Sequence, residues 1–65
     1  MINIVIKTSD GFVKVFDENK ERVLEYEGRY EEVKTRILQD APEYTIFAYK
    51  NNRGHITYLI PREKW

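Results

Sequence analysis

The chain has 65 residues, which is one domain close to the lower size limit for folding alone. Its 11 basic residues balance its 11 acidic residues, and the lack of cysteine excludes disulfides and zinc–thiolate sites. No apolar run is long enough to span a membrane, and the first residues alternate like a strand rather than a signal peptide. We therefore expect residues 1–65 to form a single compact cytoplasmic domain.

The first two predicted strands form a hairpin. Apolar and polar residues alternate over 2–7 and over 12–16, which is the period of a strand with one buried face. Gly11 lies between them, and glycine tolerates the positive φ of a bulged turn. That turn places Ile4 opposite Phe16, whereas a tighter turn would set two lysines opposite each other. We predict the bulged register.

A shorter third strand is predicted over 22–26, after a polar loop. A four-residue connection would pair Asp17 with Arg22 and Lys14 with Glu25. Both pairs join opposite charges, which favours this register, although exposed ion pairs contribute little free energy.

A helix follows. The apolar period changes at this point from two residues to between three and four. The apolar stripe comprises Tyr30, Val33, Ile37, Leu38 and Ala41. Acidic residues in the first turn suit the helix dipole, and Pro42 ends the pattern because the residue before proline avoids helical angles. We predict a helix over 29–40.

The last hairpin joins predicted strands over 44–50 and 55–60 through a turn at 51–54. Pairing residue 51 with residue 55 assigns alternate residues to a core face and an outward face. The core face would hold Ile46, Ala48, Ile56, Tyr58 and Ile60. The outward face would hold Phe47, Tyr49, His55, Thr57 and Leu59 and is unusually apolar for a solvent face.

These elements predict an α+β domain of order β-β-β-α-β-β, with a single helix packed on a mainly antiparallel sheet. A β-grasp-like sheet, with the first and last strands central and parallel, is one arrangement; an OB-like or other small, partly open barrel is the alternative. The predicted core is Ile4, Ile6, Phe16, Val33, Ile37, Ile46 and Ile60. Since the strands carry apolar side chains on both faces, the second face either lines a barrel or meets a partner.

The sequence predicts no enzymatic chemistry. It holds one histidine, one serine and no cysteine, and its three glycines are far apart. No carboxylate lies near His55 in the sequence to orient it as a base, and no residues have metal-ligand spacing. We therefore expect no catalytic residue, no metal, no cofactor and no small-molecule substrate.

The surface of the last hairpin instead predicts a non-enzymatic protein-interaction module. The expected partner-binding residues are Phe47, Tyr49, Lys50, Asn52, Arg53, His55, Leu59 and Trp65. The apolar members would supply buried area and Lys50 and Arg53 the charged rim, while Trp65 either folds back on the sheet or anchors a partner. The partner is a protein of unknown identity, and a homodimer remains open.

A short chain with no active site resembles, as a class, small phage or mobile-element accessory proteins, which act as inhibitors or adaptors. The alternative is a domain that binds single-stranded nucleic acid or RNA through the same hairpin. Basic and aromatic side chains alternate there, as they do on surfaces that stack bases and meet phosphates.

Overall fold

The alternating residues at the start of the chain form the predicted hairpin. In the computed structural model, which describes residues 1–65, β1 (Ile4–Thr8) pairs antiparallel with β2 (Phe12–Phe16). Ile4 lies opposite Phe16, so the predicted register is confirmed. Gly11 has a φ of +86°, the left-handed conformation that this turn requires.

The third strand predicted over 22–26 is wrong. Arg22 makes one isolated bridge to β2, and the chain then turns through a 3₁₀ helix, η1 (Leu24–Tyr26). Pairing with β2 resumes only in the two-residue strand β3 (Gly28–Arg29). The predicted ion pairs do not form because Arg22 pairs with Glu27, five residues along the chain, which folds this segment back on itself.

The predicted helix is confirmed to within one residue. Helix α1 (Tyr30–Asp40) buries Val33 and Ile37 against the sheet, where it packs on β2 and β3. Gly28 precedes it with a φ of +154°, and a Cβ built there would lie 3.3 Å from Val33 Cγ1. A side chain at this position would therefore strain the backbone and crowd the helix.

The last hairpin forms with a register one residue away from the predicted one. Strand β4 (Ile46–Asn51) pairs with β5 (Ile56–Leu59) so that Ala48 lies opposite Leu59 rather than Tyr58. The cause is His55, which adopts a left-handed φ of 54° in the turn instead of starting the strand. Because side chains alternate along a strand, this shift reverses one strand relative to the other: Phe47 and Tyr49 of β4 lie on the core side, against prediction, while Tyr58 and Ile60 keep the side predicted for them.

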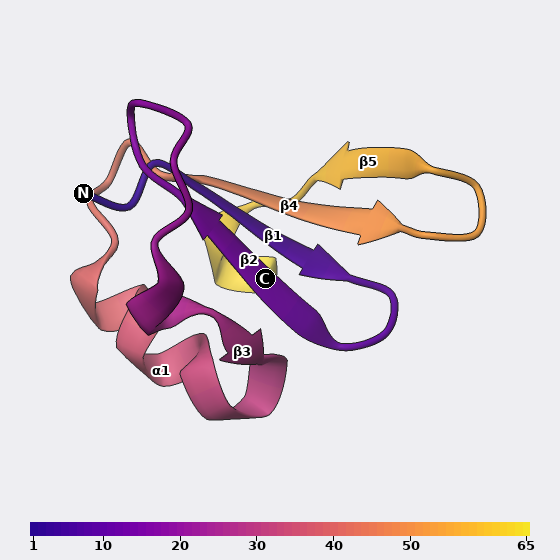
Figure 1. Ribbon diagram of the computed structural model, residues 1–65, viewed down its shortest axis with the longest axis horizontal. Helices are drawn as coiled ribbons and strands as arrows, with labels where there is room; N and C mark the ends of the chain where they lie inside the picture. The colour runs from indigo at the N-terminus through magenta and orange to yellow at the C-terminus, as the bar shows by residue number, and fades with distance from the viewer.

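The strands form one open, mixed sheet in the order β3-β2-β1-β4-β5 (Figure 1). The two central strands, β1 and β4, are parallel, and the other neighbours are antiparallel. One helix on a five-stranded mixed sheet confirms the α+β class. The β-grasp-like order is not confirmed, since β1 pairs with β4 and the last strand lies at an edge. A closed barrel is not formed either, because β3 and β5 lie at opposite edges of the sheet and do not pair with each other.

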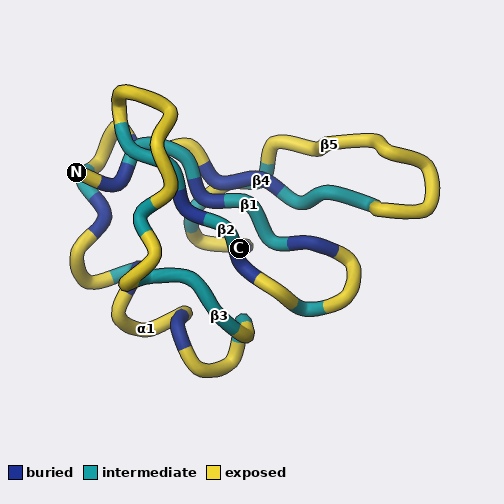
Figure 2. The backbone as a smooth tube through the Cα atoms, viewed as in Figure 1, coloured by how far each residue is buried: buried dark blue, intermediate teal, exposed yellow.

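The core lies between α1 and the sheet face that carries Val5 (Figure 2). Its buried apolar residues are Ile2, Val5, Val13, Val15, Val33, Ile37, Ala41, Phe47 and Trp65. Of the predicted core, Val33 and Ile37 are buried. The predictions of Ile4, Ile6, Phe16, Ile46 and Ile60 as core are corrected: the first three and Ile60 are only partly buried, and Ile46 is exposed. The sheet turns its other face toward the helix, away from Ile4, Ile6, Phe16 and Ile46, while Ile60 lies on the core side and packs against the core from its margin.

Trp65 completes the core, as one of its two predicted roles requires. It follows the 3₁₀ helix η2 (Arg62–Lys64) and packs on the ring of Phe47 at 4.9 Å and edge-on to Tyr30 at 5.1 Å. Its indole N–H donates to the Ala48 carbonyl oxygen over 3.3 Å, and the Tyr30 hydroxyl donates to the Trp65 carbonyl oxygen. Trp65 therefore covers the part of β4 that lies beyond α1.

Two isoleucine substitutions test which face is buried. Ile37→Ala should lower the free energy of unfolding by about 2–5 kcal/mol, because it leaves a cavity under a fully buried side chain. Ile46→Ala removes the same atoms from an exposed site and should cost less than about 1 kcal/mol. Urea unfolding followed by the fluorescence of the single tryptophan measures both. Equal losses would contradict the assignment of the faces.

Candidate functional site

The sheet face opposite α1 and Trp65 has no element covering it. We call this surface the open face. Its strand residues are Ile4, Ile6, Thr8, Phe12, Lys14, Phe16, Arg29, Ile46, Ala48, Lys50, Thr57 and Leu59. Of these, Thr8 and Ala48 are buried by their neighbours. The one α-helix packs on the other side of the sheet.

An apolar row crosses the open face over three strands. Ile4 of β1 lies between Phe16 of β2 and Ile46 of β4 in the ladder. Ile46 is 46 % exposed, while the other two are partly exposed. In the next row Ala48 lies beside Leu59, the most exposed large apolar side chain, at 77 %. Exposed apolar side chains from three strands therefore gather at this end of the open face.

The charge on the open face has one sign. Its charged strand residues are Lys14 on β2, Lys50 on β4 and Arg29 on β3, of which Arg29 pairs with Glu31, and no strand position on this face holds a carboxylate. Both lysines lie in rows away from the apolar row of Ile4. The open face thus combines an apolar row at one end with Lys14 in the next row and Lys50 in the row after it.

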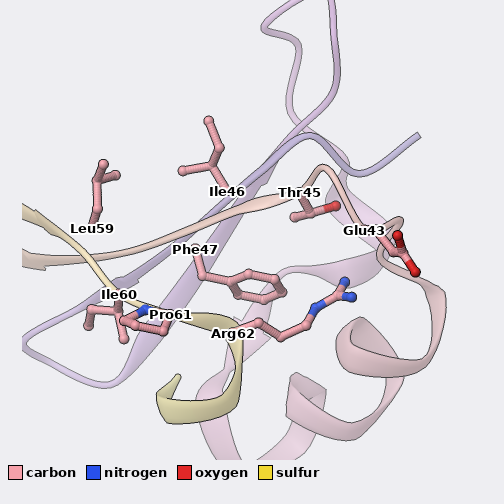
Figure 3. A pocket seen from close by; sticks show the side chains of 8 residues that line it. All are labelled: Glu43, Thr45, Ile46, Phe47, Leu59, Ile60, Pro61 and Arg62. Atoms are coloured by element: carbon pink, nitrogen blue, oxygen red, sulfur yellow. The ribbon is translucent and has the colours of Figure 1, made fainter.

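A groove of about 430 Å³ continues the apolar end past the last residue of β5 (Figure 3). It is lined by Glu43, Thr45, Ile46, Phe47, Leu59, Ile60, Pro61 and Arg62. The Arg62 side chain runs beside the Phe47 ring, with its guanidinium carbon 5.2 Å from the ring centre. One guanidinium N–H₂ group donates to the carbonyl oxygens of Ala41 and Pro42, which ties η2 to the end of α1, and Nε has no partner.

The two edges of the sheet differ. Beside β3, the Glu27 carboxylate accepts from the Val15 backbone N–H over 3.1 Å and forms two bonds with the Arg22 guanidinium. Its side chain is only 6 % exposed. The hydrogen bond from Arg22 lowers the pKa of Glu27, with the bond from Val15 acting in the same direction. Glu27 therefore satisfies the part of the β2 edge that β3 leaves unpaired, whereas all four residues of β5 are exposed.

The structure divides the predicted site residues among three places. Phe47, at 3 % exposure, and Trp65 lie in the core, so the prediction that Phe47 faces outward is wrong. The turn holds Asn52, Arg53 and His55, all exposed. The reversed faces of β4 explain the error at Phe47.

The other predicted residues lie on opposite faces of the hairpin. Lys50 and Leu59 belong to the open face. Tyr49 points to the opposite side, where its ring stacks on Tyr58 at 6.4 Å. The aromatic and basic side chains of the hairpin are therefore not brought together on one surface.

Four residues of the open face were predicted from the sequence to lie in the core and not in a site: Ile4, Ile6, Phe16 and Ile46. The signal that points to them is the presence of apolar side chains on both faces of the same strands. A single helix buries only one of those faces, so the other must remain exposed or meet a second molecule.

No group of three or more histidine, cysteine, aspartate or glutamate side chains lies together as a metal site would need. None of the helices has both the length and the apolar composition needed to cross a membrane.

Comparison with known proteins assigns the chain to no family: no family model, curated protein or solved structure matches it. The function proposed below is therefore argued from the open face and the edges of the sheet.

The hydrogen bonds of Glu27 beside β2 predict how stability depends on pH. Because folding lowers the Glu27 pKa below its ordinary value of 4.5, the unfolded chain takes up the proton first as pH falls. The stabilisation is present above about pH 5 and is lost through the acid range below it. Glu27→Gln should cost about 1–2 kcal/mol at neutral pH and reduce this acid dependence. The matched control, Glu21→Gln, alters an exposed carboxylate and should change neither. Urea unfolding at several pH values measures both, and an unchanged acid slope in Glu27→Gln would contradict the assignment.

Proposed function

We propose that this protein is a non-enzymatic protein-interaction module whose contact surface is the open face. The observation that carries the proposal is the apolar row from Phe16 through Ile4 to Ile46, which crosses one end of the three middle strands and has no helix over it. A partner that covers this row gains the hydrophobic free energy that a second layer of the domain would otherwise supply.

The charge of the open face defines the partner further. Lys14 and Lys50 would pair best with carboxylates on the partner, placed at the margin of the partner's own apolar patch. Docking two open faces on each other would instead bring the lysines of both copies together without a carboxylate, which disfavours this arrangement. We propose a different protein as the partner, with the chain acting as an inhibitor or adaptor of the kind found among phage and mobile-element accessory proteins.

Single-stranded nucleic acid is the second candidate. Phe12 and Phe16 share the open face with Lys14 and Lys50, which is the combination of ring faces and positive charge that holds bases and phosphates. The separation of Tyr49 from Lys50 weakens the predicted site on the hairpin, and the chain as a whole has no net positive charge. Protein binding is favoured for this reason.

Photo-crosslinking tests the contact surface directly. A benzophenone side chain at Ile46 should crosslink a partner protein in extracts of the source cells, whereas the same group at Leu24, which is 71 % exposed on η1, should not. With the purified partner, Ile46→Glu should weaken binding at least about 100-fold, since a charge would be buried at the interface, while Leu24→Glu should have no effect. Lys14→Glu with Lys50→Glu should mainly slow association and reduce its salt dependence.

Equal crosslinking from the two positions, or equal loss of affinity in the two glutamate variants, would contradict the proposal. Titration with labelled oligonucleotides, followed by fluorescence anisotropy at low and moderate salt, tests the second candidate. Tight binding that falls steeply with salt and is lost in the double lysine variant would replace the protein partner with a nucleic acid.

A further inference from the structure

The outer edge of β5 is a short, unprotected strand edge. The Ile60 backbone N–H donates to the Phe47 carbonyl oxygen over 2.9 Å, which identifies this as a hydrogen-bonded pair of the antiparallel ladder. Hydrogen-bonded pairs alternate with non-bonded ones, so Tyr58 and Ile56 also direct their backbone groups toward β4. Thr57 and Leu59 direct their N–H and C=O groups away from it, and no element lies on the outer side of β5 in Figure 1.

The features that usually block such an edge are missing between its two ends. Soluble proteins protect edge strands with charged side chains, proline or a covering loop. The sequence of β5 is Ile-Thr-Tyr-Leu, without charge or proline, and Ile56 and Tyr58 are each 49 % exposed. His55, with its left-handed φ, and Pro61, which lacks an N–H, bound the free edge on either side. The opposite edge of the sheet is short and sealed by Glu27.

We propose that the β5 edge pairs with β5 of a second copy of this chain, antiparallel about a two-fold axis at Tyr58. In this register Thr57 of each copy lies opposite Leu59 of the other, and each such pair exchanges two backbone hydrogen bonds. Every outward N–H and C=O group of the edge is then satisfied. The two Tyr58 side chains meet across the axis on one face, and Thr57 contacts Leu59 on the other.

A second copy suits this edge because the strand complements itself. A two-fold contact places the same residues on both sides, so a charged strand would oppose like charges, and β5 has none. The pairing joins two five-stranded sheets into one and leaves both open faces exposed and continuous. It is independent of the partner proposed for the open face.

A charge-swap experiment tests both the contact and its register. Wild type should show a mass that rises with concentration in sedimentation equilibrium. Tyr58→Lys and Tyr58→Glu should each self-associate more than about tenfold more weakly, because like charges face each other across the axis. An equimolar mixture of the two should associate again, through pairing of Lys with Glu. Tyr58→Gln controls for loss of the Tyr49 stack and should associate more tightly than either charged variant.

A backbone substitution keeps the test independent of side chains. The chain is short enough for chemical synthesis, and methylating the Leu59 backbone nitrogen removes one outward donor without touching the β4 ladder. This variant should sediment as a monomer. Methylating the Gly54 nitrogen in the same hairpin, a group in no hydrogen bond, should leave association unchanged.

Monomeric wild type at every concentration would overturn the proposal. So would association that persists in both charged variants or fails to return in their mixture. Ile46→Glu separates the two surfaces: it should abolish partner binding at the open face and leave self-association intact. If association is lost in Ile46→Glu but kept in the charged Tyr58 variants, the self-contact lies on the open face instead. That result would overturn the β5 pairing and also the proposal that a different protein binds the open face.

Discussion

The parallel pairing of β1 with β4 is the constraint on which the rest of the structure depends. Parallel neighbours cannot be joined by a tight turn, so the chain must cross from one end of the sheet to the other, and α1 lies in that connection. A helix of 11 residues is roughly 16 Å long and covers the region of β2 and β3. On the same face of the sheet, Trp65 covers the part of β4 that α1 does not reach. No helix covers the opposite face.

The uncovered face and the unprotected edge follow from this allocation of a short chain. Residues 17–27 seal one edge of the sheet by bringing Glu27 to the Val15 N–H and Arg22 to Glu27. No comparable segment lies along the outer side of β5. The residues that follow β5 turn back under β4, where Trp65 packs in the core. The same eleven-residue helix therefore accounts for the apolar open face, and the same C-terminal turn accounts for the free β5 edge.

The two proposed contacts use surfaces of different charge, so each surface favours a different partner. Lys14 and Lys50 make the open face a poor match for its own copy and a good match for an acidic, apolar partner. The uncharged β5 edge has the opposite property and matches itself. Pairing through the edge would also double the open face that a partner meets, and any ligand that binds only the folded state adds to the stability of a small core.

The sequence by itself determined the features that are set within a few neighbouring residues. Gly11 and the avoidance of facing lysines fixed the register of the first hairpin, and the apolar stripe from Tyr30 with Pro42 fixed α1. Tertiary structure decided which strand face is buried: Ile4 and Val5 are equally apolar neighbours, and only the side on which α1 and Trp65 pack distinguishes them. It also decided the faces of β4, because the left-handed His55 shifts the ladder by one residue and the two-residue period then reverses this strand relative to β5. The predicted third strand is replaced by η1, and Arg22 bonds to Glu27 on the far side of that turn.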